Sequence, residues 1–569
     1  MAKSKSNSRS SGKGSVPKMM TADGLDHPIS LKLCKRLNRF FEALTLLYSL
    51  FQACPSNGQH SNKTPSDVAE PGENHRTFME CFMNKLAQIC DNEHGGENVT
   101  SVAMIQLPDS LRYTFASNQR SAEEIAEVEA FVLSIFKYLS KASATISTTE
   151  DDVTSNPFHH ILGQIVFFHR KRIQCYRDGL VKTLSQCIED CDRREPGQDS
   201  PVKQELLKLQ CVADKSMSSA GDCASKERDE ALVRAATELR QSIIYNSIVD
   251  RGKSGKFDES QYWCELQHFI GRLVSYQRAT HTIFVARRRY PELFDIDGIQ
   301  IKFIASSKRL PNPMNAFQAG LIPMQRNKIR SAHNILSRMT GDEEMMKTYQ
   351  QYADELQRCH LDQIIEKQCC NKKFKPIVHS EVLLLDWLCK EFAEERHSVP
   401  FYGGNKYIGC SKPTCRLCEY YFAAHNSGVR VRPTHQNVYP SWIVPDALEE
   451  GEISKIKDKI IDAVLAKVRE DAFTALREKV SERKRFDSDT YSSMPTSQSL
   501  TGISVTLDDL SFRIGGLSIS PHPRIPPIVV KSRLNIFDDT WSVAAHEDYS
   551  GSEDDNSGVL VFTGRNKRS

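Results

Sequence analysis

Apolar residues recur every three or four positions along most of the first 300 residues, a pattern that predicts amphipathic α-helices. The clearest of these helices begins after Ser30 and cannot continue past Pro55. Its apolar residues share one face: Leu33, Leu37, Phe40, Leu44, Leu47 and Phe51. Further helices are expected near residues 78–89, 122–139, 161–188, 226–248 and 259–289. No fixed repeat joins them, so we predict an irregular α-helical region of one or two domains over residues 29–297.

The pattern changes after residue 297, where short alternating or extended runs appear between helical segments. Ile299–Ala305 alternates apolar and polar side chains and predicts a strand. Further strands are expected at Phe374–Val378, Tyr407–Cys410 and Gly428–Arg432. Strands that alternate with helices indicate an α/β domain, which we place at residues 298–450. An amphipathic helix, capped by Asp446, is expected over residues 451–485.

Both ends of the chain lack such periodicity. Residues 1–28 are basic and serine-rich, and residues 486–569 are rich in Ser, Thr, Pro and Asp, so both tails are expected to be disordered. The N-terminus has no apolar run of a secretory signal, and the most apolar window, Ala43–Ala53, is too short to span a membrane. We therefore expect an intracellular protein, cytoplasmic or nuclear, with any protein partners bound through the C-terminal helix and tail.

Composition adds little about partners. The 569 residues carry a net charge of +3, with 39% hydrophobic and 26% charged residues, so global charge does not indicate a nucleic-acid partner. Local basic clusters at His169–Arg172 and Arg287–Arg289 can bind phosphate, or can form solvated helix faces, which is the interpretation we favour. The 17 cysteines are mostly scattered singly, unlike those of a secreted disulfide scaffold.

The stretch Pro376–Cys418 concentrates residues that can hold a metal ion. His379 opens one apolar helical segment, and Cys415 and Cys418 open another, spaced so that both thiols lie on one helical face. One imidazole and two thiolates suit Zn²⁺ and leave a fourth position for water. Glu381 lies two residues after His379, where its carboxylate can move protons between zinc-activated water and a departing amine. These parts are those of a zinc-dependent hydrolytic deaminase.

Three alternatives compete with this interpretation. Cys410 precedes Cys415 by five residues and is a second candidate ligand. A purely structural zinc site in a catalytically inactive interaction protein would need a fourth protein ligand and would not need the Glu381 carboxylate. A redox C-x-x-C pair would explain neither His379 nor Glu381.

The order HSE, then YIGCSKPTCRLC, then RPTHQNVYPSW resembles the cytidine deaminase-like superfamily, and within it a fungal branch of predicted zinc-dependent nucleic acid or nucleotide deaminases with a helical N-terminal region. The resemblance covers roughly Tyr352–Pro445. It implies an α/β/α sandwich around a mixed sheet, with His379, Cys415 and Cys418 as zinc ligands and Glu381 as the proton shuttle. The sequence departs from the usual Pro-Cys pair, because Thr414 separates Pro413 from Cys415.

A substrate pocket is less clearly marked. Tyr402 and Trp442 lie near predicted strand edges and could stack on a flat base, while Asn405 and His435 could read its polar edge. The same rings would serve equally well in a hydrophobic core. The expected substrate is a base with an exocyclic amine in a nucleoside, a nucleotide or a nucleic acid.

Overall fold

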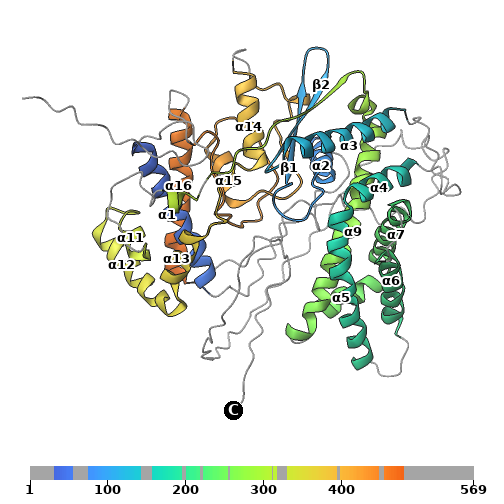
Figure 1. Cartoon of the computed structure of the whole chain (residues 1–569), viewed down its shortest axis with the longest axis horizontal. Coiled ribbons are helices and arrows are strands. Elements are labelled where there is room, and N and C mark those ends of the chain that lie inside the picture. Colours follow the sequence, from blue (N-terminus) through green and yellow to red (C-terminus); the bar gives the residue numbers. More distant parts are fainter. Residues whose placement is uncertain are drawn as a thin grey trace, which may run out of the picture.

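The structure is a computed structural model that describes residues 31–54, 75–141, 157–194, 200–217, 222–253, 257–310, 312–316, 330–393, 398–447 and 454–479. The tails predicted to be disordered, residues 1–28 and 486–569, lie outside the described residues. Figure 1 shows a small sheet near the centre, a bundle of helices on one side of it, and the first and last described helices side by side on the other.

Four strands form a mixed sheet in the order β3-β2-β1-β4. Strands β1 (Thr100–Gln106) and β2 (Leu111–Ser117) are an antiparallel pair, β3 (Ile299–Phe303) runs parallel to β2, and the short β4 (Gly409–Cys410) runs antiparallel to β1. Single bridges extend this arrangement, among them Tyr407 with Arg430. The helical N-terminal region, the mixed sheet and its flanking helices agree with the predicted fold class.

Two of these strands correct the expectation that residues 29–297 are only helical. β1 and β2 lie within that range and are central in the sheet, with every residue buried except Gln106. Strands that are buried on both faces lose the polar alternation that marks a half-exposed strand, so their sequences predict a strand weakly. The sheet therefore joins residues on both sides of the predicted boundary at residue 297.

The predicted strands after residue 297 have mixed outcomes. β3 confirms the prediction at Ile299–Ala305, and β4 keeps only the end of Tyr407–Cys410. Phe374–Val378 and Gly428–Arg432 contribute single bridges, Ile377 with Trp442 and Tyr407 with Arg430, where continuous strands were expected.

Helices account for most of the described residues. Their bounds are α1 Leu31–Ala53, α2 His75–Cys90, α3 Ala122–Lys141, α4 Pro157–Phe168, α5 Arg170–Arg194, α6 Pro201–Met217, α7 Asp222–Gln241, α8 Ile244–Lys253, α9 Phe257–Arg289, α10 Pro313–Ala316, α11 Ala332–Leu336, α12 Glu343–Glu355, α13 Leu361–Cys370, α14 Ser380–Glu391, α15 Arg416–Ala424 and α16 Ser454–Glu478. Short 3-10 turns are η1 Pro291–Phe294, η2 Leu356–Cys359 and η3 Tyr402–Gly404. Within the described ranges, no helix has the length and apolarity needed to cross a membrane.

The sheet separates two hydrophobic cores. Val102 and Met104 of β1 point into a core with α2 and the helical bundle, whereas Ala103 and Ile105 point into a core with α14 and α15. This alternation follows from the two-residue period of a strand. Helix α2 lies very close to β4, because a Cβ placed on Gly409 would be 2.7 Å from the Met83 backbone. The layers are therefore helix, sheet and helix.

In the sequence, the bundle of α4–α9 lies between β2 and β3. Buried polar contacts join it to the end of α2. Asp91 and Arg172 form an ion pair at 2.9 Å, and His169 lies within hydrogen-bond distance of the Ile89 carbonyl. The predicted basic cluster at His169–Arg172 is thus partly internal. In the other cluster, Arg287 donates to the Leu139 carbonyl. These contacts favour the structural interpretation of both clusters.

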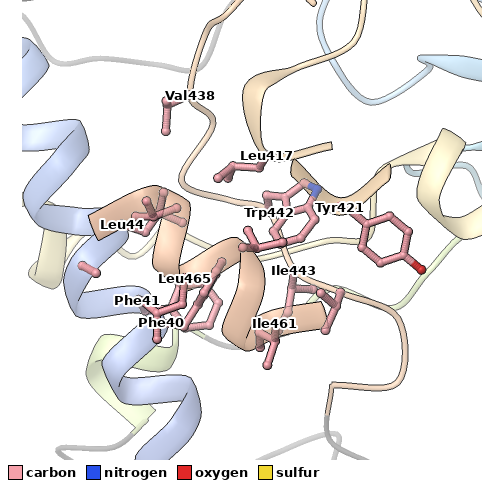
Figure 2. Close-up of a cluster of buried hydrophobic side chains, with 14 of the residues drawn as sticks. Phe40, Phe41, Leu44, Leu417, Tyr421, Val438, Trp442, Ile443, Ile461 and Leu465 are labelled. Atoms are coloured by element: carbon pink, nitrogen blue, oxygen red, sulfur yellow. The ribbon is translucent and has the colours of Figure 1, made fainter. Parts of the chain in front are cut away.

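Helices α1 and α16, the first and last described helices, pack together and contribute to the core that contains α14 and α15. Arg36 of α1 pairs with Asp458 of α16 at 2.6 Å, and the apolar face of α16 packs against α1 and α15. Figure 2 shows the apolar packing between α1 and α16, with Phe40 and Leu465 in the same cluster as Trp442. Asp446 was predicted to cap this helix, but α16 begins at Ser454, eight residues later. Asp446 has a left-handed φ of 48° and forms an ion pair with Lys457 in the first turn of α16.

Candidate metal centre

Two helix starts meet at one point next to the sheet. His379 is the N-cap of α14, Cys415 is the N-cap of α15, and Cys418 lies in the first turn of α15. The three possible ligand atoms all lie within 4.8 Å of one another. His379 Nδ1 is 3.5 Å from Cys415 Sγ and 3.4 Å from Cys418 Sγ. The structure therefore brings together the three residues predicted as metal ligands.

These separations fit a tetrahedral zinc site. Bond lengths of about 2.3 Å for Zn–S and about 2.05 Å for Zn–N at a tetrahedral angle place sulfur and nitrogen about 3.6 Å apart. The two observed distances of 3.5 and 3.4 Å are close to this value. Cys410, the other candidate ligand, is buried but does not belong to the cluster, which consists of His379, Cys415 and Cys418 among the described residues.

The His379 side chain does not cap α14, the helix that follows it. An N-cap side chain ordinarily accepts a hydrogen bond from the first turn, but the His379 ring makes no such bond. Asn118, which follows β2, accepts the Ser380 backbone N–H at 2.7 Å in its place. The Ser380 hydroxyl lies 2.8 Å from the Ser101 hydroxyl of β1. The buried hairpin thus positions the helix that carries the ligand.

The start of α15 is fixed by the sulfur atoms themselves. Cys415 Sγ accepts the backbone N–H of Cys418 at 3.4 Å, as a capping side chain would. The other sulfur, Cys418 Sγ, accepts a hydrogen bond from Trp442 Nε1 at 3.2 Å. Donors to a ligating sulfur orient it and tune its charge, so Trp442 is placed to support a metal ion that Cys418 would hold.

The two thiols share their protons unequally. Burial opposes ionisation of Cys415, but the hydrogen bond with Cys418 and the nearby His379 outweigh burial and lower the pKa of Cys415 to about 6. Burial and the adjacent Cys415 raise the pKa of Cys418 well above its usual value. Together they present one thiolate readily, and a bound cation would favour the second, because metal-coordinated thiols are deprotonated.

Glu381 lies in the first turn of α14, beside the ligands. Its side chain is buried, and Oε2 accepts a hydrogen bond from the Ser380 hydroxyl at 3.4 Å. The carboxylate also lies within hydrogen-bonding reach of the Cys418 thiol, and its negative charge raises the pKa of Cys418. A buried carboxylate next to a metal-binding cluster, and not part of that cluster, is the arrangement expected of a proton-transfer group.

Tyr402 and Asn405 are not brought to this cluster. Both line a cavity of about 380 Å³ on the α2 side of the sheet, with Arg76, Met104 and Arg430 among the other lining residues and none of the metal ligands. Asn405 Oδ1 accepts a hydrogen bond from Arg430 at 3.0 Å. The lining of this cavity does not include the candidate metal ligands, and contact of these two residues with a base stays a prediction.

Trp442 and His435 do lie near the cluster, in different roles. Trp442 is fully buried between Phe40 and Tyr421, so its ring is not exposed for stacking on a base. His435 is also buried, and its Nδ1 accepts the Asn437 backbone N–H at 2.9 Å. Its ring meets the Tyr439 ring edge-on at 5.7 Å.

Tyr439 is a further aromatic residue beside the cluster. It is partly exposed, and its ring lies 6.2 Å from the His379 ring. The sequence pointed only to a loop rich in aromatic residues at this place, without a reason to choose Tyr439 within it. Asn118 and Ser101 carried no signal, because their roles arise from contacts with Ser380, more than 260 positions away along the chain.

Comparison with known proteins agrees with this geometry. A family model described as an OTT_1508-like deaminase matches residues 378–446. No curated protein and no solved structure matches the chain. The match begins immediately before His379 and includes Cys415, Cys418 and the loop to Trp442. Residues 378–446 are therefore similar to a deaminase family and contain a His/Cys/Cys group that could hold a metal ion.

Proposed function

We propose that this protein is a zinc-dependent hydrolytic deaminase that removes an exocyclic amine from a base in a nucleoside, a nucleotide or a nucleic acid. The observation that carries the proposal is the convergence of His379, Cys415 and Cys418 at two helix starts, with the buried Glu381 beside them. The deaminase family match over the same residues supports it. The narrower resemblance to a fungal branch and an intracellular location remain predictions.

The residues divide the chemistry between binding and proton transfer. Zinc held by one imidazole and two thiolates supplies Lewis acidity and makes water a nucleophile near neutral pH. Glu381 would take one proton from the water that adds to the amine-bearing ring carbon and pass it to the adjacent ring nitrogen. It would then take the remaining proton from the added hydroxyl group and deliver it to the departing amine, so that a C=O bond forms as the C–N bond breaks. The products are the keto form of the base and ammonia. Ser380 and Ser101 would hold the Glu381 carboxylate in place.

A structural zinc site in an inactive protein is the competing proposal. Such a site is usually closed by a fourth protein ligand. In the described part of the chain the cluster holds three potential ligands, which leaves a position open for water. Glu381 would also have no function in a closed site, although its burial beside Cys418 costs desolvation energy. Both observations favour the enzyme.

The test compares the parent protein with Glu381→Gln, which keeps the size and hydrogen bonding of the side chain but removes its charge. Metal content is measured by mass spectrometry, and ammonia release is measured from nucleosides, nucleotides, single-stranded DNA and RNA. We expect about one zinc per chain in both proteins and ammonia release from the parent alone. A metal-free parent, or equal turnover by the two proteins, would refute the proposal.

A further inference from the structure

Two segments that lead to the metal centre lie side by side and carry five basic residues. The backbone N–H of Leu310 donates to the Pro376 carbonyl at 2.9 Å, and Asn312 donates to the Asn371 carbonyl at 2.9 Å. The order of these contacts shows that the two segments run antiparallel, with Leu310 beside Pro376 and Asn312 beside Asn371. We call their basic residues the basic patch: Lys308, Arg309, Lys372, Lys373 and Lys375.

The patch adjoins the metal centre. The Ser307 hydroxyl accepts the Val378 backbone N–H at 3.0 Å, and Val378 directly precedes the ligand His379. Arg309 donates to the Gln119 side chain at 3.0 Å, next to Asn118, which caps the helix of His379. With a rise of about 3.3 Å per extended residue, Lys375 is within about 13 Å of His379.

The charge of the patch is almost uncompensated. All five side chains belong to exposed residues. Arg309 pairs with Glu97. Among the residues that the structure describes, Lys308, Lys372, Lys373 and Lys375 form no ion pair. Five cations with one carboxylate partner make a local positive field, even though the whole chain is nearly neutral at +3.

We propose that the basic patch binds the phosphate backbone of a single-stranded nucleic acid whose target base enters the metal centre. This inference rests on the proposed deaminase function and names its substrate class. A free nucleoside carries no phosphate for these side chains, and one nucleotide carries its phosphate close to the base. A strand carries further phosphates beyond the target nucleotide, and a patch that extends away from the site can contact them.

A single strand fits the site better than a duplex. The metal ligands are buried or partly buried, so a base must leave its stack to reach them. Unpaired nucleotides need no disruption of base pairs before they enter. Tyr439, partly exposed beside His379, offers a ring on which such a base can stack.

The experiment measures strand binding apart from catalysis. Full-length, zinc-loaded protein carrying Glu381→Gln is titrated into fluorescently labelled 20-nucleotide single-stranded DNA and RNA at several salt concentrations. The test variant adds Lys372→Gln, Lys373→Gln and Lys375→Gln. The matched control instead adds Lys137→Gln, Lys182→Gln and Lys347→Gln, which remove the same charge from exposed positions on α3, α5 and α12.

Counterion release predicts the size of the effect. Each lost phosphate contact lowers the slope of log K against log salt by about 0.7 for a single strand, so three contacts lower it by about 2. At 0.1 M salt this corresponds to roughly 100-fold weaker binding by the patch variant. The control variant should bind as the unsubstituted protein does.

Equal loss of binding by the patch and control variants would overturn the proposal, because net charge and not the patch would then be responsible. Unchanged binding by the patch variant would overturn it too. These outcomes are distinct from failure of the deaminase function, which is measured as ammonia release by the parent. Deamination of free nucleotides without strand binding would refute the patch and leave the deaminase function intact.

Discussion

Replacement of Trp442 by phenylalanine tests whether the buried indole N–H strengthens metal binding by Cys418. The indole N–H donates to Cys418 Sγ at 3.2 Å, and the ring is fully buried against Phe40 and Tyr421. Phenylalanine keeps an aromatic ring in this cluster, seen in Figure 2, but removes the donor. We expect weaker zinc binding, because the Cys418 thiolate loses a hydrogen bond that helps to stabilise and orient it.

The magnitude follows from the type of bond. A hydrogen bond to a charged acceptor contributes about 1.5–3 kcal/mol. Loss of a group that supports a metal ligand lowers metal affinity by about 10- to 100-fold, which corresponds to about 1.4–2.7 kcal/mol. The two ranges overlap, so we expect Trp442→Phe to weaken zinc binding by about 10- to 100-fold.

Zinc affinity is measured by competition with a chelator, and the thiolate charge-transfer band of the Co²⁺-substituted protein reports on the sulfur ligands. Trp263→Phe is the matched control, because Trp263 is equally buried and its indole donates to Asp190 at 2.9 Å in the helical bundle. The control should lose stability without a change in zinc affinity or in the band. If Trp442→Phe behaved in the same way as Trp263→Phe, the hydrogen bond would be structural only, and our reasoning would be wrong.

Two further predictions concern packing and pH. Gly409→Ala should destabilise the protein by about 1–3 kcal/mol, because the added Cβ would lie 2.7 Å from the Met83 backbone. Urea unfolding measures this loss. The control Gly341→Ala should change the stability only slightly, because Gly341 has open space around it. Burial would raise the pKa of Asp91, but Arg172, Lys412 and Arg120 together outweigh burial and lower this pKa. The stability due to the carboxylate is therefore complete above about pH 4 and is lost as the pH falls through the lowered value. Asp91→Asn should therefore be less stable than the parent at pH 7, with a difference that shrinks in acid; a constant difference between pH 7 and pH 2.5 would contradict this.

The ligand set was predictable from the sequence because its information is local. His379 with Glu381, and Cys415 with Cys418, are pairs two or three residues apart, and each pair opens an apolar helical segment. Helix starts and metal-ligand spacing depend on neighbours within one turn. The long helices α1 and α16 were predictable for the same reason, since their apolar periodicity needs no tertiary contact to be seen.

The hairpin of β1 and β2 needed the tertiary structure. Their side chains are buried on both faces, so the sequence shows neither clear alternation nor helical periodicity there. What identifies them as strands is their pairing with each other, with β3 and with β4, across an inserted bundle of helices. The sheet therefore crosses the predicted boundary at residue 297, because strands before and after the inserted bundle pair with one another.

The sequence alone identified the candidate metal ligands His379, Cys415 and Cys418 and the carboxylate of Glu381, because the spacing within each pair lies inside a single helix turn. Only the tertiary structure decided what supports and surrounds them. It buried Trp442 as a donor to Cys418, placed Tyr402 and Asn405 in a cavity whose lining lacks the candidate metal ligands, and joined two distant segments into a basic patch. These outcomes depend on contacts between residues far apart in the chain, which local pattern and spacing do not encode.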